Sequence, residues 1–116
     1  MSLLEKTLIA ALEDRKAVDL ARVDVRPWSD QFHVFLIATA TSGRHAMAIA
    51  DYLSETLKHH EAFGKPVRIQ KDAEAEWILM DFDTIIVHIM QQEARHFYNL
   101  EKLWMTPSAG PRSTSL

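Results

Sequence analysis

Two aspartates separated by one residue, Asp81 and Asp83, form a D-x-D pair whose carboxylates could do chemistry. Residues two apart on a straight strand face the same way, so two carboxylates at this spacing could hold Mg²⁺. The pair lies between two apolar runs that predict adjacent strands, and aspartate is favoured in turns because its side chain bonds to the local backbone. The short gap between the two strands therefore predicts a hairpin turn, and the spacing of the aspartates leaves a metal-binding pair as the alternative.

The segment TSGR, residues 41–44, lies between an apolar run and a helical pattern. Backbone N–H groups at a helix N-terminus can hold an anion, and the arginine of this segment could assist. The dinucleotide-binding glycine fingerprint and the P-loop lysine are both missing. We interpret the segment as a helix start capped by Thr41 or Ser42. The enzyme alternative is a nucleotidyltransferase-like protein that uses this helix start together with Asp81, Asp83 and Mg²⁺.

Six histidines raise the question of a metal or catalytic site. They form no His-x-x-x-His or His-Glu-x-x-His pattern, so no zinc site is predicted. His88 lies on a largely apolar strand and is expected to be half-buried with one hydrogen bond. A triad of Ser42, His88 and Asp81 can be written down, but nothing in the sequence brings the three together. No catalytic residue, metal site or cofactor is therefore predicted.

Hydrophobic periodicity predicts the elements that must position these side chains. Helices are expected over residues 3–16, from the TSGR segment to Gly64, and from about residue 92. Ser2 and Glu5 have the spacing of a capping box at the first of these helices. Strands are expected at residues 18–26, 32–40, 67–71, 77–82 and 84–91, the last two forming a hairpin. The order α-β-β-α-β-β-β-α predicts an α/β (α+β) fold in which helices pack on a central, mixed, five-stranded sheet.

Length and composition predict one domain over residues 1–104 and a flexible C-terminal tail over residues 105–116. The chain has 116 residues and no cysteine, which fits a reducing compartment and predicts a cytoplasmic location. No apolar run approaches the roughly 20 residues of a membrane span, so no membrane contact is expected. The net charge of −3, without a run of Lys and Arg, predicts that any nucleic-acid contact is at most indirect.

Large apolar and aromatic side chains crowd into RHFYNLEKLW, residues 95–104, between charged ones. If helical spacing turns Phe97, Leu103 and Trp104 inward, Tyr98 and Leu100 point partly away from the core. Tyrosine and tryptophan are over-represented at binding hot spots because they combine a large apolar area with one polar group. We therefore predict that the first three are core residues, and that Tyr98 and Leu100, with Trp77, are exposed.

The residues EAEWILMDFDTIIVHIMQQEARHFYNLEKLW, 74–104, closely resemble the signature of the ribosomal silencing factor family, also called Iojap-like proteins. FLIATATSGRHAMAIADYL resembles the family's strand, T-S-x-R-H junction and following helix. The resemblance covers Leu4 to Trp104. The chain departs from the family pattern at four turns or helix starts, which are Gly43, Gln70-Lys71, Asp83-Thr84 and Gln92.

This resemblance implies a protein that binds the large ribosomal subunit. Family members dock on ribosomal large-subunit protein fourteen at the intersubunit face, block joining of the small subunit, and damp translation when nutrients are scarce. Their fold resembles that of nucleotidyltransferases but lacks the catalytic acids. The resemblance therefore implies a steric mechanism, a nucleotidyltransferase-like topology and no enzymatic activity.

Six residues are expected to contact the partner. Trp77, Tyr98 and Leu100 are the expected anchors, because a few large side chains supply most of the energy of an interface. The polar partners that would set the register are Asp81, Glu101 and Lys102. A homodimer formed through the exposed aromatic residues is the alternative left open.

Overall fold

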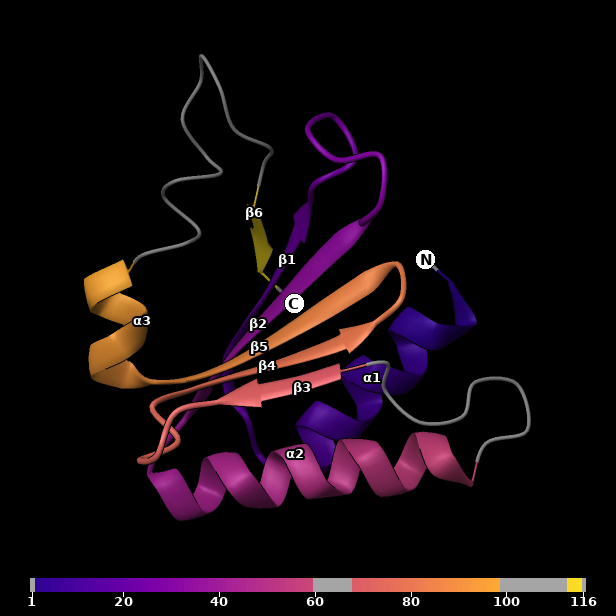
Figure 1. Ribbon diagram of the computed structural model, residues 1–116. Coiled ribbons are helices and arrows are strands. Elements are labelled where there is room, and N and C mark those ends of the chain that lie inside the picture. The colour runs from indigo at the N-terminus through magenta and orange to yellow at the C-terminus, as the bar shows by residue number, and fades with distance from the viewer. Residues whose placement is uncertain (1, 60–67, 99–112, 116) are drawn as a thin grey trace.

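Figure 1 shows the computed structural model of the chain, which describes residues 2–59, 68–98 and 113–115. The elements are α1 (Leu3–Asp14), β1 (Val18–Asp24), β2 (Val34–Ala40), α2 (Gly43–Lys58), β3 (Arg68–Lys71), β4 (Trp77–Phe82), β5 (Ile85–Gln91), α3 (Gln92–Tyr98) and β6 (Ser113–Ser115). The mixed α/β fold and the predicted order of the first eight elements are confirmed. None of the helices in the described part of the chain has the length and apolar character that crossing a membrane requires.

The strands form one sheet in the order β3-β4-β5-β2-β1-β6. The two central strands, β2 and β5, run parallel, whereas β4 pairs antiparallel with β5 and β1 pairs antiparallel with β2. Parallel strands need a long crossover connection, and α2 lies in the crossover between β2 and β5. The central strands are buried on both faces, which explains why their sequences are almost continuously apolar.

Residues 113–115 differ from the predicted flexible tail. They form β6, which pairs antiparallel with residues 21–23 of β1. Without β6, this part of β1 would be the edge of the sheet, and the unpaired N–H and C=O groups of an edge accept another extended segment readily. The sheet thus contains the five predicted strands and one more. Residues 105–112 and 116 of the predicted tail lie outside the described residues.

Helices α1 and α2 lie on one face of the sheet (Figure 1) and bury the main core against it. The residues of β4 in this core are Ile78, Met80 and Phe82. Because successive strand residues face opposite sides, Trp77, Leu79 and Asp81 point to the other face, where they are half-buried. The register of β4 on β5 therefore decides which side chains are available away from the helices.

A buried ion pair ties α1 to the sheet. Ser2 Oγ accepts the backbone N–H of Glu5 at 3.1 Å, so the predicted helix cap is present. The Glu5 carboxylate does not turn back to complete the capping box. It is buried, with 3% of the residue exposed, and it accepts hydrogen bonds from Nε and Nη2 of Arg22 on β1. A carboxylate at this depth needs such a partner, because an unpaired buried charge is strongly destabilising.

We predict that Glu5→Ala lowers the free energy of unfolding by about 2 to 3 kcal/mol, because it leaves the Arg22 guanidinium without its anion in a mostly buried place. Urea unfolding measures this change. Glu13→Ala is the matched control on the exposed side of the same helix and should stay within about 0.5 kcal/mol of wild type. Equal effects of the two substitutions would contradict the proposed importance of the pair.

Candidate functional site

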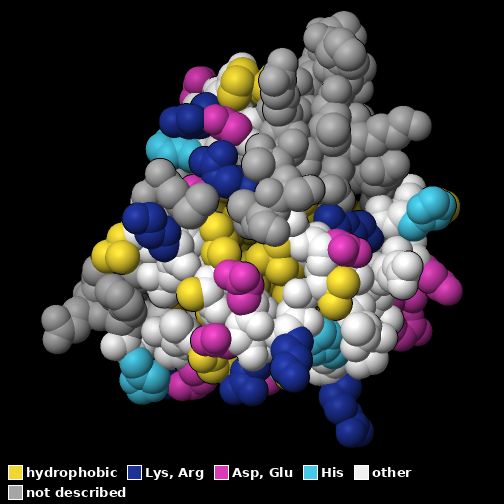
Figure 2. Space-filling model, turned by 180° about the vertical axis from the view of Figure 1, so that it is seen from behind, with side chains coloured by type: hydrophobic (Ala, Val, Ile, Leu, Met, Phe, Trp, Pro, Cys, Tyr) yellow, Lys and Arg dark blue, Asp and Glu magenta, His cyan; other side chains and the backbone are white. Residues whose placement is uncertain are grey.

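The sheet face opposite α1 and α2 is the candidate site, and we call it the open face. Its central side chains come from β2, β4 and β5 and are mostly apolar: Phe35, Ile37, Trp77, Leu79, Ile86, His88 and Met90. Helix α3 packs over part of this face through Ala94, which is buried beside Ile37 and Met90. Figure 2 shows the molecule from behind, where apolar side chains come to the surface among acidic and basic ones.

Trp77 and His88 are hydrogen-bonded across the open face. The indole Nε1–H of Trp77 donates to Nδ1 of His88 at 3.1 Å, and the two ring centroids are 5.8 Å apart. Phe35 of β2 packs edge-on against the His88 ring with centroids 4.9 Å apart. The three rings thus connect the three neighbouring strands β4, β5 and β2 and leave Trp77 half-buried.

The burial of His88 determines its protonation. Only 4% of the residue is exposed, and desolvation lowers its pKa from 6.5 to about 4, so the ring is neutral at pH 7. Since Nδ1 accepts from Trp77, the single ring proton is on Nε2. This buried Nε2–H has no hydrogen-bond partner among the described residues, and an unsatisfied buried donor costs roughly 1–3 kcal/mol. The predicted single hydrogen bond of His88 is confirmed, but the residue is buried more deeply than expected.

The Asp81–Asp83 pair forms the hairpin turn. Asp81 Oδ1 accepts the backbone N–H of Asp83 at 2.9 Å, and Asp83 has a positive φ of 72°. Aspartate tolerates this conformation better than most residues and often bonds to the backbone two residues on. The predicted turn is therefore confirmed.

The enzyme alternative required Asp81 and Ser42 to converge, and they lie at opposite ends of the sheet. The register places Asp81 opposite Ile86, which in turn pairs with Phe35 near the start of β2. Ser42 lies beyond the end of that strand, and the stretch from Phe35 to Ala40 alone spans about 16 Å at roughly 3.3 Å per residue. The Ser42/His88/Asp81 triad is not formed either, because Trp77 donates to Nδ1 of His88 and neither Ser42 nor Asp81 bonds to Nε2.

The TSGR helix start is a structural junction. Ser42 Oγ accepts the backbone N–H of His45 at 3.0 Å, so Ser42 is the N-cap of α2. His45 Nδ1 accepts the backbone N–H of Thr41 at 2.9 Å, and its Nε2–H donates to the carbonyl of Arg15 at 2.7 Å. These bonds join the end of α1, the end of β2 and the start of α2. The interpretation as a capped helix start is confirmed.

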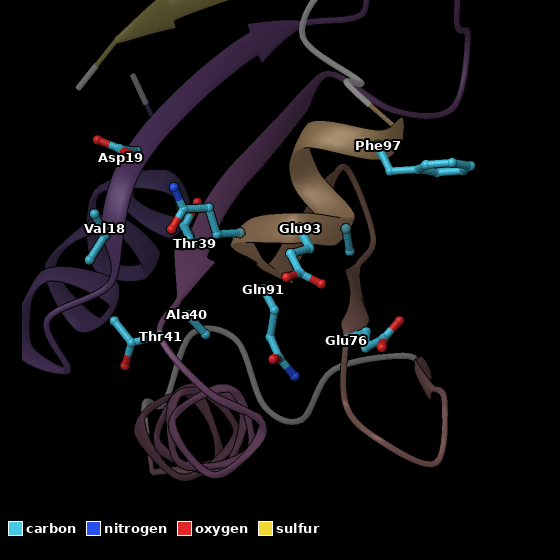
Figure 3. A pocket seen from close by; sticks show the side chains of 11 residues that line it. Val18, Asp19, Thr39, Ala40, Thr41, Glu76, Gln91, Glu93 and Phe97 are labelled. Carbon is cyan, nitrogen blue, oxygen red and sulfur yellow. The ribbon is translucent and has the colours of Figure 1, made fainter.

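A cavity of about 790 Å³ lies at the carboxyl ends of β2 and β5. Its lining includes three acidic residues, Asp19, Glu76 and Glu93. Figure 3 shows Glu93 and Gln91 in the middle of this cavity, with Phe97 directed away from it. Sequence reasoning missed this cavity, because its walls come from segments far apart in the chain. The three carboxylates of the lining accept hydrogen bonds, so this part of the cavity suits donor-rich or cationic groups.

A second group of three acidic residues, which shares Glu76 with the cavity, lies in the connection from β3 to β4. Carboxylate oxygens of Asp72, Glu74 and Glu76 lie within 4.8 Å of one another, and all three residues are exposed. Asp72 also accepts the backbone N–H of Trp77 at 3.1 Å, which lowers the pKa of its carboxyl group. This bond holds the backbone at the start of β4, from which the Trp77 side chain extends.

The structure brings together two of the six expected partner contacts. Trp77 and Asp81 lie on β4, four residues apart on the open face, with Leu79 between them. Tyr98 is the last residue of α3, and its side chain lies outside the described residues. Leu100, Glu101 and Lys102 also lie outside them, as do Leu103 and Trp104, which were expected in the core.

The prediction that Phe97 is a core residue is wrong, because 80% of it is exposed. In α3 the buried Ala94 faces the sheet, and Arg95 reaches Thr39 Oγ1 of β2 with its Nη1 at 2.7 Å. The inward side of the helix therefore lies between these two residues. At about 100° per residue, Phe97 is roughly 110° from that direction. An apolar pattern in so short a helix did not reveal which side would be inward.

We predict that stability falls by up to about 3 kcal/mol between pH 6.5 and pH 4, because the unfolded chain protonates His88 near pH 6.5 and the folded chain only near pH 4. Lowering the pH through this window therefore favours the unfolded state. His88→Asn, which does not titrate, should show a correspondingly flatter profile in urea unfolding. The hydrogen bond with Arg26 lowers the pKa of Asp24 from 3.8 to about 2, so its contribution is lost only below this window. Identical profiles for wild type and His88→Asn would disprove the role of His88.

Comparison with known proteins identifies the family. The model described as "Ribosomal silencing factor during starvation" matches residues 2–115. The chain is 40% identical over 106 residues to the ribosomal silencing factor of Haemophilus influenzae, with 90% of this chain and 99% of that protein covered. It is 36% identical over 99 residues to the mouse mitochondrial assembly of ribosomal large subunit protein 1, with 84% and 43% covered.

A solved structure agrees with this assignment. The crystal structure of a protein from Chromobacterium violaceum matches with a TM-score of 0.81 and 30% identity, covering 90% of this chain and 87% of that one. The family match spans every described element, including the hairpin that carries Trp77 and Asp81. The chain therefore belongs to the ribosomal silencing factor family.

Proposed function

We propose that this protein binds the large ribosomal subunit at ribosomal large-subunit protein fourteen, blocks joining of the small subunit and thereby represses translation in the cytoplasm. The observation that carries this proposal is the match of residues 2–115 to a family described as silencing ribosomes during starvation. The mechanism is steric, so binding alone is sufficient and no bond has to be made or broken.

The open face supports this proposal, because it offers a large anchor among apolar neighbours. Trp77 is half-buried beside the partly exposed Leu79, and Phe35 lies nearby on the same face. A specific interface needs about 800 Å² from each partner, and a few aromatic residues usually supply most of its energy. Trp77 is the proposed anchor within the described residues.

Asp81 is the proposed polar contact at the end of β4. Its Oδ1 is engaged in the hairpin turn, and no bond to Oδ2 is found among the described residues. The half-buried carboxylate can therefore receive a donor from the partner without giving up its turn contact. A charged group at the rim of an interface sets register and association rate more than affinity.

The segment after α3 would extend this contact. Helix α3 follows directly on β5, the strand that pairs with β4, and it ends at Tyr98. We propose that Tyr98 and Leu100 act as further anchors and that Glu101 and Lys102 supply polar contacts. The net charge of −3 favours docking on a protein surface of the subunit over direct contact with RNA.

We predict that Trp77→Ala weakens binding to purified large subunits by about 30-fold or more, as expected for loss of a hot-spot anchor of about 2 kcal/mol. Co-sedimentation with large subunits measures the affinity, and light scattering on addition of small subunits measures whether joining is blocked. Leu3→Ala is the matched control, since it removes a large exposed apolar side chain from α1 on the other side of the sheet. The control should bind and block joining as wild type does.

Two outcomes would overturn the assignment. Wild-type protein that does not bind large subunits, or binds without affecting joining, would contradict the proposed function. Folded Trp77→Ala and Tyr98→Ala proteins that bind normally would contradict the proposed site. A second copy of the chain is the competing occupant of this face, and sizing of wild type and Tyr98→Ala over a range of concentrations identifies that case.

A further inference from the structure

His88 is a buried polar residue whose hydrogen bonding is incomplete. It is one of three polar or charged residues in the described part of the chain that are buried, the others being Glu5 and Thr39. Glu5 is paired with Arg22, and Thr39 Oγ1 accepts from Arg95. Among the residues that the structure describes, His88 bonds through Nδ1 alone, and its buried Nε2–H finds no partner there.

An apolar side chain at this position would avoid the unsatisfied Nε2–H. What it would lose is the acceptor at Nδ1, which receives the only hydrogen that an indole can donate. Packing alone therefore does not account for a histidine here. The feature that the histidine adds is the bond to Trp77.

The strand register and the neighbouring ring of Phe35 determine how the Trp77 and His88 side chains meet. In the β4–β5 register Trp77 is opposite Met90 and Leu79 is opposite His88, so the indole reaches diagonally across the face to His88. Phe35 of β2 packs edge-on against the His88 ring, with ring centroids 4.9 Å apart and an interplanar angle of 61°. The imidazole is therefore held by β2 and in turn holds the indole of β4.

We propose that His88 is a positioning residue of the docking face, whose Nδ1 holds the Trp77 indole in the orientation in which it meets the ribosomal partner. This inference rests on the proposed function and adds to it a residue that contacts Trp77 rather than the partner. An anchor that is oriented before binding loses less rotational freedom on association, so the affinity is higher for the same contacts.

The test compares substitutions that keep or move the acceptor. His88→Asn places an amide oxygen where Nδ1 was, whereas His88→Gln moves the amide outward by one methylene group and His88→Leu removes the acceptor. The Trp77 indole N–H resonance, assigned with Trp77→Phe, reports the hydrogen bond in the free protein. Co-sedimentation with large subunits reports binding, with wild type and Trp77→Ala as references.

We expect His88→Leu and His88→Gln to shift the Trp77 indole resonance away from its wild-type position and to weaken subunit binding about 3- to 10-fold. His88→Asn should restore both toward wild type. If His88→Leu does not fold, the pair of Asn and Gln variants decides the question, because both are polar and differ in where the acceptor lies.

The outcomes separate this inference from the proposed function. If wild type binds subunits and Trp77→Ala does not, but the Leu and Gln variants bind as wild type does, His88 is not a positioning residue. The same conclusion follows if the indole resonance is unchanged in the Leu and Gln variants, or if Asn and Gln variants lose binding equally. Failure of wild type itself to bind would instead refute the proposed function.

Discussion

The parallel pairing of β2 with β5 is the contact on which the rest of this structure depends. It runs without interruption from Val34 opposite Ile85 to Ala40 opposite Gln91. Because parallel neighbours cannot be joined by a tight turn, the chain must cross over between them, and α2 lies across one face of the sheet as part of that crossover. Strand β4 precedes β5 and pairs with it antiparallel in a hairpin. The register of this hairpin turns Trp77 and Asp81 to the face that α1 and α2 leave uncovered.

The two faces of the sheet consequently differ in the interactions that hold their side chains. On the helix side, apolar burial dominates, and the polar contacts lie at its margins, where Glu5 meets Arg22 and His45 joins α1 to α2. On the open face, polar bonds sit among apolar side chains and orient particular groups, as Trp77 does with His88 and Arg95 with Thr39. A surface of oriented aromatic groups is suited to recognition, because the orientation is fixed before the partner arrives.

The sequence was sufficient for the features that depend on neighbouring residues. Alternation and apolar runs predicted the five main strands, Ser42 was a candidate N-cap, and the short gap between residues 77–82 and 84–91 predicted the hairpin turn. These features are local, since each is determined within a few residues of chain. The resemblance of the hairpin and the following segment to the ribosomal silencing factors likewise predicted the family that the comparisons establish.

The features that sequence reasoning missed all depend on contacts between distant segments. Glu5 completes no capping box because Arg22, 17 residues away, takes its carboxylate. Phe97 is exposed because Ala94 and the bond of Arg95 to Thr39 decide how α3 rests on the sheet. The bond between Trp77 and His88 and the cavity at the ends of β2 and β5 exist only once the strand register is known.

The central claim is that the open face meets the ribosome, and site-specific photo-crosslinking on large subunits tests it most directly. A photoreactive residue in place of Leu79, between Trp77 and Asp81 on β4, should crosslink to ribosomal large-subunit protein fourteen. The same group in place of Glu55, exposed on α2, should not. Crosslinks to that protein from position 55 and none from position 79 would contradict the account, because they would place the helices against the subunit.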